Sequence, residues 1–527
     1  MRIVITGGDT PLARAAAAAI PADAQVRLVD TRFAAEPRAG AEALAGDLRD
    51  PALAAAAVAG AQVVLHLAPL ARSGDDLTDL ELATAGTYQL FTAAADAGAR
   101  RFILGSTLAL FNRLPASYLV DERWRPRPTA APADLCAWLS ETCARELARD
   151  LPLPALCLRF GSIVGDAEIA AQPYDPRWLH IDDAAEAIRR ALAYDEPGWS
   201  ILHISAGGPH SKVPLGVARD GLGFQPRRDF RDAQAPPPDA GAAQGSWRDL
   251  LAPQATVPAR PIRRVVIFGA GGPLAAAVAA ELAPDYTLRL TDIEPLAEIA
   301  ARARPQSPGA PLPRVLGAPH ESLVADVTDP EAVLAACAGA DAIVNCTVIR
   351  NDPAQAFRVN TLGAYNVMRA ALAHGIARVV HTGPYQVALL GPTSYQWDYD
   401  VPDDAPARPG AGHGAQLYFH SKRLGQEICR VFAENHGLTV PALLFVEFVN
   451  PDRPERPHIF PFAVSWRDAA RAVRRALEVP ALPEPFEVLH ISADLPHGVF
   501  RTDKARRLLG WEPRDTLEHL WSGPRGA

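Results

Sequence analysis

The sequence predicts two α/β domains in tandem, each built on a doubly wound parallel sheet. Short runs of Val, Ile and Leu alternate along the chain with longer alanine-rich stretches of helical periodicity. These runs are apolar at every position, as strands are when helices cover both faces of a sheet. The whole pattern then occurs a second time within the 527 residues, and a repeat of this length indicates two copies of one domain.

Matching segments align the two copies element by element. The first strand, Arg2–Thr6, recurs as Arg264–Phe268, and each copy runs from this strand into a glycine. The second strand ends in Asp30 in the first copy and in Asp292 in the second. Each copy closes on a similar motif, LGFQP in the first and LGWEP in the second, so the repeat extends over almost the whole chain.

We expect one domain at residues 1–232 and another at 262–527. Between them, residues 233–261 include the segment APPPDAGAAQG, whose Pro-, Ala- and Gly-rich composition predicts a semi-rigid linker. The second copy is the longer of the two because it carries a Pro- and Gly-rich insertion near 304–320.

Composition narrows the classes of function. The chain has 52 Lys and Arg against 60 Asp and Glu, a formal net charge of −8, which disfavours nucleic acid and an anionic membrane surface as partners. None of the six cysteines forms a Cys-x-x-Cys pair, so we expect no metal site and a reducing compartment. The first strand follows Met1 directly, without a signal segment, which predicts a soluble, cytoplasmic protein.

A glycine-rich turn follows the first strand of the second copy and opens a helix. It contains Gly269, Gly271 and Gly272, followed by Pro273 and Leu274. Glycine allows the backbone to approach phosphate oxygens, and a helix N-terminus attracts them. Asp292 would accept hydrogen bonds from both ribose hydroxyls and would repel a 2′-phosphate. The pattern predicts a Rossmann-like site for NAD rather than NADP, and the alternative is a purely structural turn.

The first copy is altered in the same turn. Thr10 stands where the second copy has Gly272, and Asp9 adds a negative charge beside it. A side chain at this position would crowd a pyrophosphate, and a carboxylate would repel it. Asp30 and Asp47 are retained, but we favour degraded or lost nucleotide binding over an intact site.

The strongest catalytic signal lies in a segment of helical periodicity at 417–434. A spacing of four places Tyr418 and Lys422 on one face of this helix. A cationic neighbour lowers the pKa of a phenol, which would let Tyr418 act as a general base near neutral pH. Lys422 could also hold the nicotinamide ribose. The alternative is an exposed surface pair, because the same spacing is common by chance.

These motifs, together with NTLGAYN at 360–366, resemble the extended short-chain dehydrogenases/reductases, which form the NAD-dependent epimerase/dehydratase superfamily. The resemblance covers both copies, and each copy looks most like the uronate dehydrogenase branch. It implies a small C-terminal substrate-binding portion in each domain, with Tyr418 as the base and Lys422 as the ribose clamp. It further implies NAD contacts for Asp326, Val327, Cys346 and Asn360, of which Asn360 would also brace the active site.

Two departures from the family pattern concern catalysis. The family places a Ser or Thr after the fifth strand to polarise the substrate oxygen, and Pro384 stands there in the second copy. Thr382 or Tyr385 must then substitute, or the chemistry is weakened. The first copy has the opposite defect, because Ala137 and Glu141 replace the Tyr and Lys of the catalytic pair. We therefore expect the first copy to be catalytically inactive.

The resemblance implies an NAD-dependent oxidoreductase or epimerase that acts on a sugar, sugar acid or sugar nucleotide, with the chemistry in the second copy. The alternative is a non-catalytic NAD-binding sensor or scaffold. Relatives commonly dimerise through two helices per subunit, so the tandem chain could form an internal pseudo-dimer and stay monomeric. Helices near 82–97 and 133–149 would then pack on those near 356–374 and 417–434.

Overall fold

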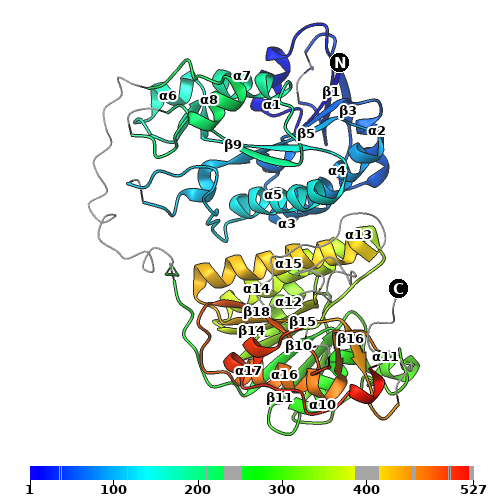
Figure 1. The fold of residues 1–527 in the computed structure, drawn as a ribbon. Helices are drawn as coiled ribbons and strands as arrows, with labels where there is room; N and C mark the ends of the chain where they lie inside the picture. The colour runs from blue at the N-terminus through cyan, green and yellow to red at the C-terminus, as the bar shows by residue number, and fades with distance from the viewer. Residues whose placement is uncertain are drawn as a thin grey trace. The chain divides into compact units, whose positions relative to one another are not determined.

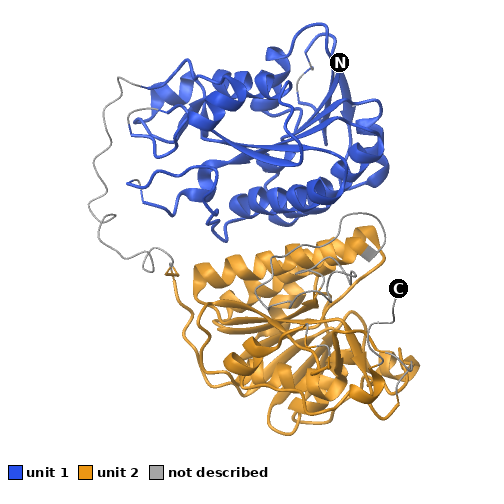
Figure 2. Cartoon of the chain, in the orientation of Figure 1, with its two compact units in different colours: residues 1–251 blue, residues 252–527 orange. Residues whose placement is uncertain are grey.

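The computed structural model of the chain divides into two compact units, residues 1–251 and 252–527 (Figure 2). Of the expected linker, residues 233–251 lie outside the part of the chain that the structure describes. Residues 255–261 belong to the second unit. The described residues are 1–34, 36, 38–115, 117–207, 210–230, 252–253, 255–385, 415–453, 459–496, 498 and 500–521.

The first unit contains a seven-stranded sheet in which every neighbouring pair of strands is parallel. Its strands are β1 (Arg2–Thr6), β2 (Gln25–Asp30), β3 (Glu42–Ala45), β4 (Val63–His66), β5 (Arg101–Thr107), β6 (Ala155–Phe160) and β9 (Trp199–Ile204). The strand order is β3-β2-β1-β4-β5-β6-β9, so chain order reverses between β1 and β4. A separate pair consists of β7 (Ser162–Val164) and β8 (Trp178–His180).

Helices cover both faces of this sheet (Figure 1). They are α1 (Pro11–Ala19), α2 (Pro51–Val58), α3 (Asp76–Glu81), α4 (Thr87–Asp96), α5 (Pro132–Asp150), α6 (Asp166–Ala171), α7 (Ile181–Ala191) and α8 (Gly216–Leu222). On one face α1 packs against α7, and on the other α4 packs against α2 and α5. A stretch of π-helix, Leu82–Gly86, joins α3 to α4.

The second unit repeats this architecture with the strand order β12-β11-β10-β13-β14-β15-β18, again all parallel. Its strands are β10 (Arg264–Phe268), β11 (Thr287–Asp292), β12 (Glu321–Val324), β13 (Ala342–Asn345), β14 (Arg378–Pro384), β15 (Val440–Phe445) and β18 (Phe486–His490). A small parallel pair consists of β16 (Glu447–Val449) and β17 (Ala463–Ser465). The prediction of two doubly wound parallel sheets is confirmed.

On one face of the second sheet α10 packs against α16, and on the other α14 packs against α12 and α15 (Figure 1). The helices are α10 (Pro273–Leu282), α11 (Leu296–Arg302), α12 (Pro330–Cys337), α13 (Pro353–Phe357), α14 (Gly363–Ala373), α15 (Ala415–His436), α16 (Trp466–Glu478) and α17 (Asp503–Leu509). Several begin with proline, which lacks the N–H that a first turn leaves unpaired. Asp329 and Asp352 cap α12 and α13 by accepting backbone N–H bonds.

The central strands are buried along their length, as their uniformly apolar sequences predict. Val265, Val266, Ile267 and Phe268 of β10 are all 0% exposed. Alanine-rich helices can pack close to such a sheet because their side chains are small. In the described part of the chain, no helix combines the length and apolar character needed to cross a bilayer.

A second stretch of π-helix, Arg358–Leu362, lies between α13 and α14. It contacts α15, and a Cβ on Gly425 would lie 2.1 Å from the carbonyl oxygen of Asn360. Glycine is therefore required where these two segments cross. The close approach brings Asn360 next to the helix that carries Tyr418 and Lys422, so the π-helix helps to position the site.

Candidate active site

A cavity of about 780 Å³ opens at the carboxyl ends of the strands of the second unit. It lies where chain order reverses between β10 and β13, the usual ligand position in an open α/β sheet. Its volume is in the range of small-molecule and cofactor sites. The predicted site residues that line it are Gly269, Gly271, Gly272, Pro273, Leu274, Asp292, Asp326, Val327, Cys346, Thr382, Tyr418 and Lys422.

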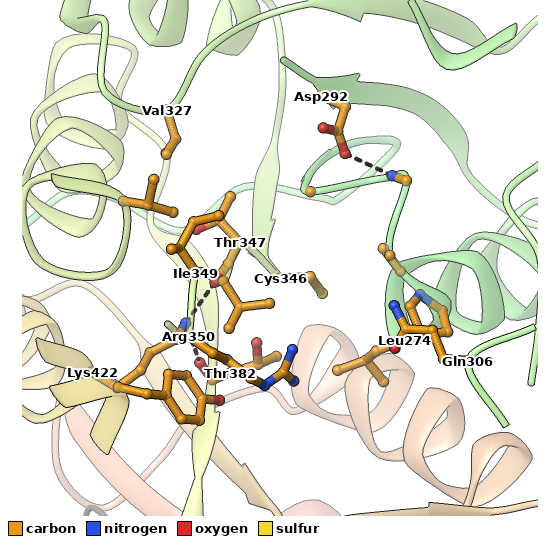
Figure 3. Close-up of a pocket in the computed structure, with 18 of the residues that line it drawn as sticks. Leu274, Asp292, Gln306, Val327, Cys346, Thr347, Ile349, Arg350, Thr382 and Lys422 are labelled. Carbon is orange, nitrogen blue, oxygen red and sulfur yellow. Dashed lines mark hydrogen bonds between the residues drawn. The ribbon is translucent and has the colours of Figure 1, made fainter. Parts of the chain in front are cut away.

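The glycine turn forms one wall of this cavity. Gly269 has φ +79°, and a Cβ there would lie 3.0 Å from backbone atoms of Cys346 and Thr347, so the chains of β10 and β13 meet only because the residue is glycine. Gly272 caps α10, whose first residue is Pro273. The N–H of Gly271 donates a hydrogen bond of 2.7 Å to Asp292 Oδ2 (Figure 3).

Asp292 and Val327 lie at one end of the cavity, away from Lys422 and Arg350 (Figure 3). Val327 is 3% exposed, and its carbonyl accepts a hydrogen bond of 3.0 Å from Asn366. The neighbouring Asp326 accepts hydrogen bonds from the backbone and side chain of Thr328. This end presents a carboxylate and an apolar wall, the surroundings that an adenosine requires.

Tyr418 and Lys422 reach the opposite end of the cavity from α15. Lys422 is 2% exposed, and its ammonium group donates hydrogen bonds to the carbonyl oxygens of Thr347 (2.7 Å) and Thr382 (3.3 Å) (Figure 3). Burial lowers the pKa of Lys422 to about 8. A buried ammonium needs acceptors, and these two strand-end carbonyls supply them.

The cation that contacts the phenol is Arg350 rather than Lys422. Its guanidinium carbon lies 5.3 Å from the centre of the Tyr418 ring. Burial raises the pKa of Tyr418 to about 12, while the charge of Arg350 and its hydrogen bond to the phenol act in the opposite direction. The expectation that Lys422 is the neighbour that lowers this pKa therefore differs from the structure, because its ammonium group is held by backbone carbonyls instead.

The two candidates for the missing Ser or Thr hydroxyl lie in different surroundings. Thr382 lines the cavity, and its hydroxyl donates a hydrogen bond of 2.9 Å to the carbonyl oxygen of Asn345. Tyr385 is 1% exposed, and its ring stacks on Phe462 at 4.9 Å. Of these two, only Thr382 lines the cavity.

Asn360 is the one predicted site residue that is not in the cavity wall. Its side-chain amide donates hydrogen bonds to the carbonyl oxygen of Ile349 (2.7 Å) and to Ser421 Oγ (2.9 Å). Its own oxygen accepts a bond from the N–H of Ile349 (3.2 Å). This geometry fits the bracing role and places Asn360 behind the residues that would touch a cofactor.

In the first unit, the altered turn is closed by its own side chains. The hydroxyl of Thr10 accepts a hydrogen bond from the N–H of Ala13 and so caps α1. Asp9 forms an ion pair with Arg14, and its second oxygen accepts a hydrogen bond of 2.9 Å from the N–H of Ala34. The side chains of Asp9 and Thr10 are therefore both held within the protein.

Buried charges occupy the place of the catalytic pair in the first unit. Glu141 stands at the position of Lys422, and both its carboxylate oxygens accept hydrogen bonds from Arg159, at 2.9 and 2.7 Å. Ser106 donates to the same carboxylate, and Arg159 also approaches His203 at 3.3 Å. Glu141 and Arg159 are each 2% exposed. The network fills this position with a buried ion pair.

Arg350 and Gln306 line the cavity and were not predicted from the sequence. Arg350 follows the end of β13, and aligning the copies there would have shown Ala71 at the same place in the first unit. Gln306 belongs to the insertion near 304–320, which has no counterpart in the first copy. In the structure it lies beside Leu274 (Figure 3), and Asn450 donates a hydrogen bond to the carbonyl of Gly309 in the same insertion.

Comparison with known proteins identifies one family. Residues 3–176 and 265–464 match the sequence profile of the NAD dependent epimerase/dehydratase family. An L-arabinose 1-dehydrogenase (NAD(P)(+)) of Haloferax volcanii is 29% identical over 215 residues, which is 37% of this chain and 82% of the relative. A uronate dehydrogenase of Agrobacterium fabrum is 30% identical over 207 residues, 38% of this chain and 70% of the relative.

Similar solved structures cover about half of the chain. A mutant uronate dehydrogenase from Agrobacterium tumefaciens, complexed with NAD, is 21% identical with a TM-score of 0.40, over 45% of this chain and 92% of that one. A glucuronic acid dehydrogenase from Chromohalobacter salexigens is 22% identical with a TM-score of 0.39, over 45% of this chain and 91% of that one.

Proposed function

Because the chain belongs to the NAD dependent epimerase/dehydratase family, we propose that its second unit is an NAD-dependent oxidoreductase or epimerase that acts on a sugar, sugar acid or sugar nucleotide. The observation that carries the proposal is a single cavity that joins the glycine turn to Tyr418 and Lys422. The relatives named as dehydrogenases of arabinose and of uronates support the sugar-like substrate.

The residues at the glycine turn fit a dinucleotide. A Cβ at Gly271 would lie 3.0 Å from the carboxylate of Asp292, so only glycine leaves the turn open toward that carboxylate. The N-terminus of α10 would hold the pyrophosphate, and Asp292 would hold the ribose. When bound, NAD would supply the acceptor for a hydride from the substrate carbon.

In the proposed reaction Tyr418 takes the proton of the substrate hydroxyl while the hydride leaves the same carbon. A phenol with a pKa near 12 is a poor base at neutral pH, so it needs the nearby cations. Arg350 already contacts the phenol, and Lys422 lies one helical turn further along α15. Thr382, which lines the same cavity, would hydrogen-bond the substrate oxygen.

Replacing Tyr418 with Phe tests this assignment. We expect turnover to fall by more than about 100-fold, in the range of general-base effects, while NAD affinity measured by calorimetry stays nearly unchanged. Tyr385→Phe is the matched control, because Tyr385 packs against Phe462 rather than toward the cavity. If Tyr418→Phe retained full turnover, the assignment of Tyr418 as the base would be wrong. A wild type that binds NAD without turning over any of these sugars would favour the sensor or scaffold alternative, and a wild type that binds no NAD would contradict the NAD site.

We infer that the first unit is a pseudo-domain. The engaged side chains of Asp9 and Thr10 and the Glu141–Arg159 pair support this. Calorimetric titration with NAD should then give one site per chain, and two sites would contradict the inference. That the two copies form an internal pseudo-dimer is a prediction from the sequence. It requires a monomer in sedimentation experiments, and a stable homodimer built through the same helices would contradict it.

A further inference from the structure

Arg350 lies in the segment that follows β13 and lines the cavity together with Tyr418, Lys422 and Thr382. Its side chain extends on the same side of the cavity as Lys422, across from Leu274 and Gln306 (Figure 3). The residue is exposed, so a ligand that enters the cavity can reach its guanidinium group.

The charge of Arg350 is not balanced by any carboxylate of the described residues. Arg302, the other arginine of the cavity wall, forms a 2.6 Å ion pair with Glu294. The acidic residues in the described lining are Asp292, Glu294 and Asp326. Asp292 and Val327 lie at the end away from Lys422 (Figure 3), Glu294 follows Asp292 by two residues, and Asp326 directly precedes Val327. The end that holds the catalytic pair therefore presents two cations and no acid among its described residues.

The first unit offers an internal comparison. When the strands β4 and β13 are aligned, Ala71 stands at the position of Arg350. The next residue, Arg72, forms ion pairs with Asp76 (2.8 Å) and Asp79 (3.1 Å). The first unit thus has alanine at this point, and the neighbouring guanidinium, although exposed, is engaged by two carboxylates.

We propose that Arg350 binds an anionic group of the substrate, so that the second unit selects sugars that carry a carboxylate or a phosphate. The inference rests on the proposed function and assigns a specificity-determining residue to it. A guanidinium presents parallel N–H donors that match the paired oxygens of both groups. A guanidinium has five N–H donors, so Arg350 can bind an anion while it keeps its contact with the Tyr418 ring.

The test compares three substrates of one sugar configuration: the hexuronic acid, the hexose 6-phosphate and the neutral hexose. For wild type we expect kcat/KM to be higher for at least one anionic substrate than for the neutral one. Arg350→Gln should reduce that preference by about 10- to 100-fold, the value of a hydrogen bond to a charged group, mainly through KM. The preference is the ratio of kcat/KM for an anionic substrate to kcat/KM for the neutral one. An effect of Arg350 on Tyr418 that is equal for both substrates therefore cancels.

Arg350→Lys should keep part of the preference for the anionic substrate, because lysine retains the positive charge but lacks the parallel N–H donors of a guanidinium. Arg369→Gln is the matched control, since Arg369 lies over Tyr365 at 5.6 Å but is exposed outside the cavity, and it should change nothing. If Arg350→Gln removes the preference for only one of the two anionic substrates, the anionic group of that substrate, carboxylate or phosphate, is the ligand of Arg350. An unchanged preference in Arg350→Gln, or a wild type that prefers the neutral hexose, would overturn the inference and leave the proposed function standing. Absence of NAD binding would overturn both.

Discussion

Replacing Lys422 with Met should make the second unit more stable at pH 7 and less stable at pH 10. In the folded chain burial lowers the pKa of Lys422 from 10.5 to about 8. One pKa step corresponds to about 1.4 kcal/mol, so keeping this ammonium charged in the fold costs about 3 kcal/mol at pH 7. Methionine removes that cost and has a similar length.

Two terms oppose this gain. The carbonyl oxygens of Thr347 and Thr382 lose the hydrogen bonds that Lys422 donates, at about 1 kcal/mol each. The net change at pH 7 is therefore a stabilisation of about 1 kcal/mol. Between pH 8 and 10.5 the unfolded wild type binds more protons than the folded one, so wild-type stability rises with pH. The variant lacks this rise and should be about 1 kcal/mol less stable than wild type at pH 10.

Urea unfolding followed by brief subtilisin digestion measures this, because fragments of each compact unit can be assigned by mass spectrometry. Lys212→Met is the matched control in the first unit. Lys212 donates hydrogen bonds of 2.8 Å to the carbonyls of Phe111 and Leu114, and burial also lowers its pKa to about 8. Lys212→Met should change the stability of the first unit with pH in the same direction but by less, because Lys212 is less buried than Lys422. It should not reduce turnover. A Lys422→Met variant less stable than wild type at pH 7 would refute the reasoning.

Three further predictions test the two sites. Asp292→Asn should raise NADP affinity by about 10-fold relative to NAD, because the repulsion of the 2′-phosphate is removed; calorimetry with both cofactors measures it. Gly271→Asp combined with Gly272→Thr transfers the first turn into the second unit, and NAD affinity should fall by at least about 100-fold in the same titration. Glu141→Gln should destabilise the first unit by about 3 kcal/mol, because the buried charge of Arg159 loses its partner. Replacing both Glu141 and Arg159 with Leu should restore most of that stability in the urea assay. An equal loss of stability in the single and double variants would show that the ion pair is not the cause.

The architecture and most of the site followed from local sequence. Strand segments that are apolar at every position predicted a sheet covered by helices on both faces, and the repeated order of elements predicted two such sheets. Gly269 could be placed in a turn because it directly follows a predicted strand. Asp292 could be placed at the edge of the sheet because it is the last residue of the next predicted strand. Tyr418 and Lys422 could be paired because a helix fixes the direction of residues four apart.

Contacts between distant segments did not follow from local sequence. The partners of Lys422 are carbonyl oxygens at the ends of two different strands, and carbonyls carry no sequence signal. Arg350 reaches Tyr418 from a segment whose conformation is fixed by Asn360, through hydrogen bonds to Ile349. In the sequence, Glu141 shows only that the first copy has no lysine at the position of Lys422. Its pairing with a residue of β6 depends on the packing of α5 against the sheet.

The two units differ in one consistent way, and the difference bears on whether activity could return to the first. The second unit has glycine at the turn, and it places polar side chains in the wall of its cavity on the helix that carries Tyr418 and Lys422 and after the fourth strand in chain order. The first unit satisfies the corresponding group within the protein: Asp9 by Arg14, and Glu141 by Arg159. A lysine restored at position 141 would therefore face the buried guanidinium of Arg159 instead of a cofactor, and two like charges in that position would destabilise the unit. Restoring Tyr at 137 and Lys at 141 should thus yield a less stable first unit without turnover, unless Arg159 and Asp9 are replaced as well.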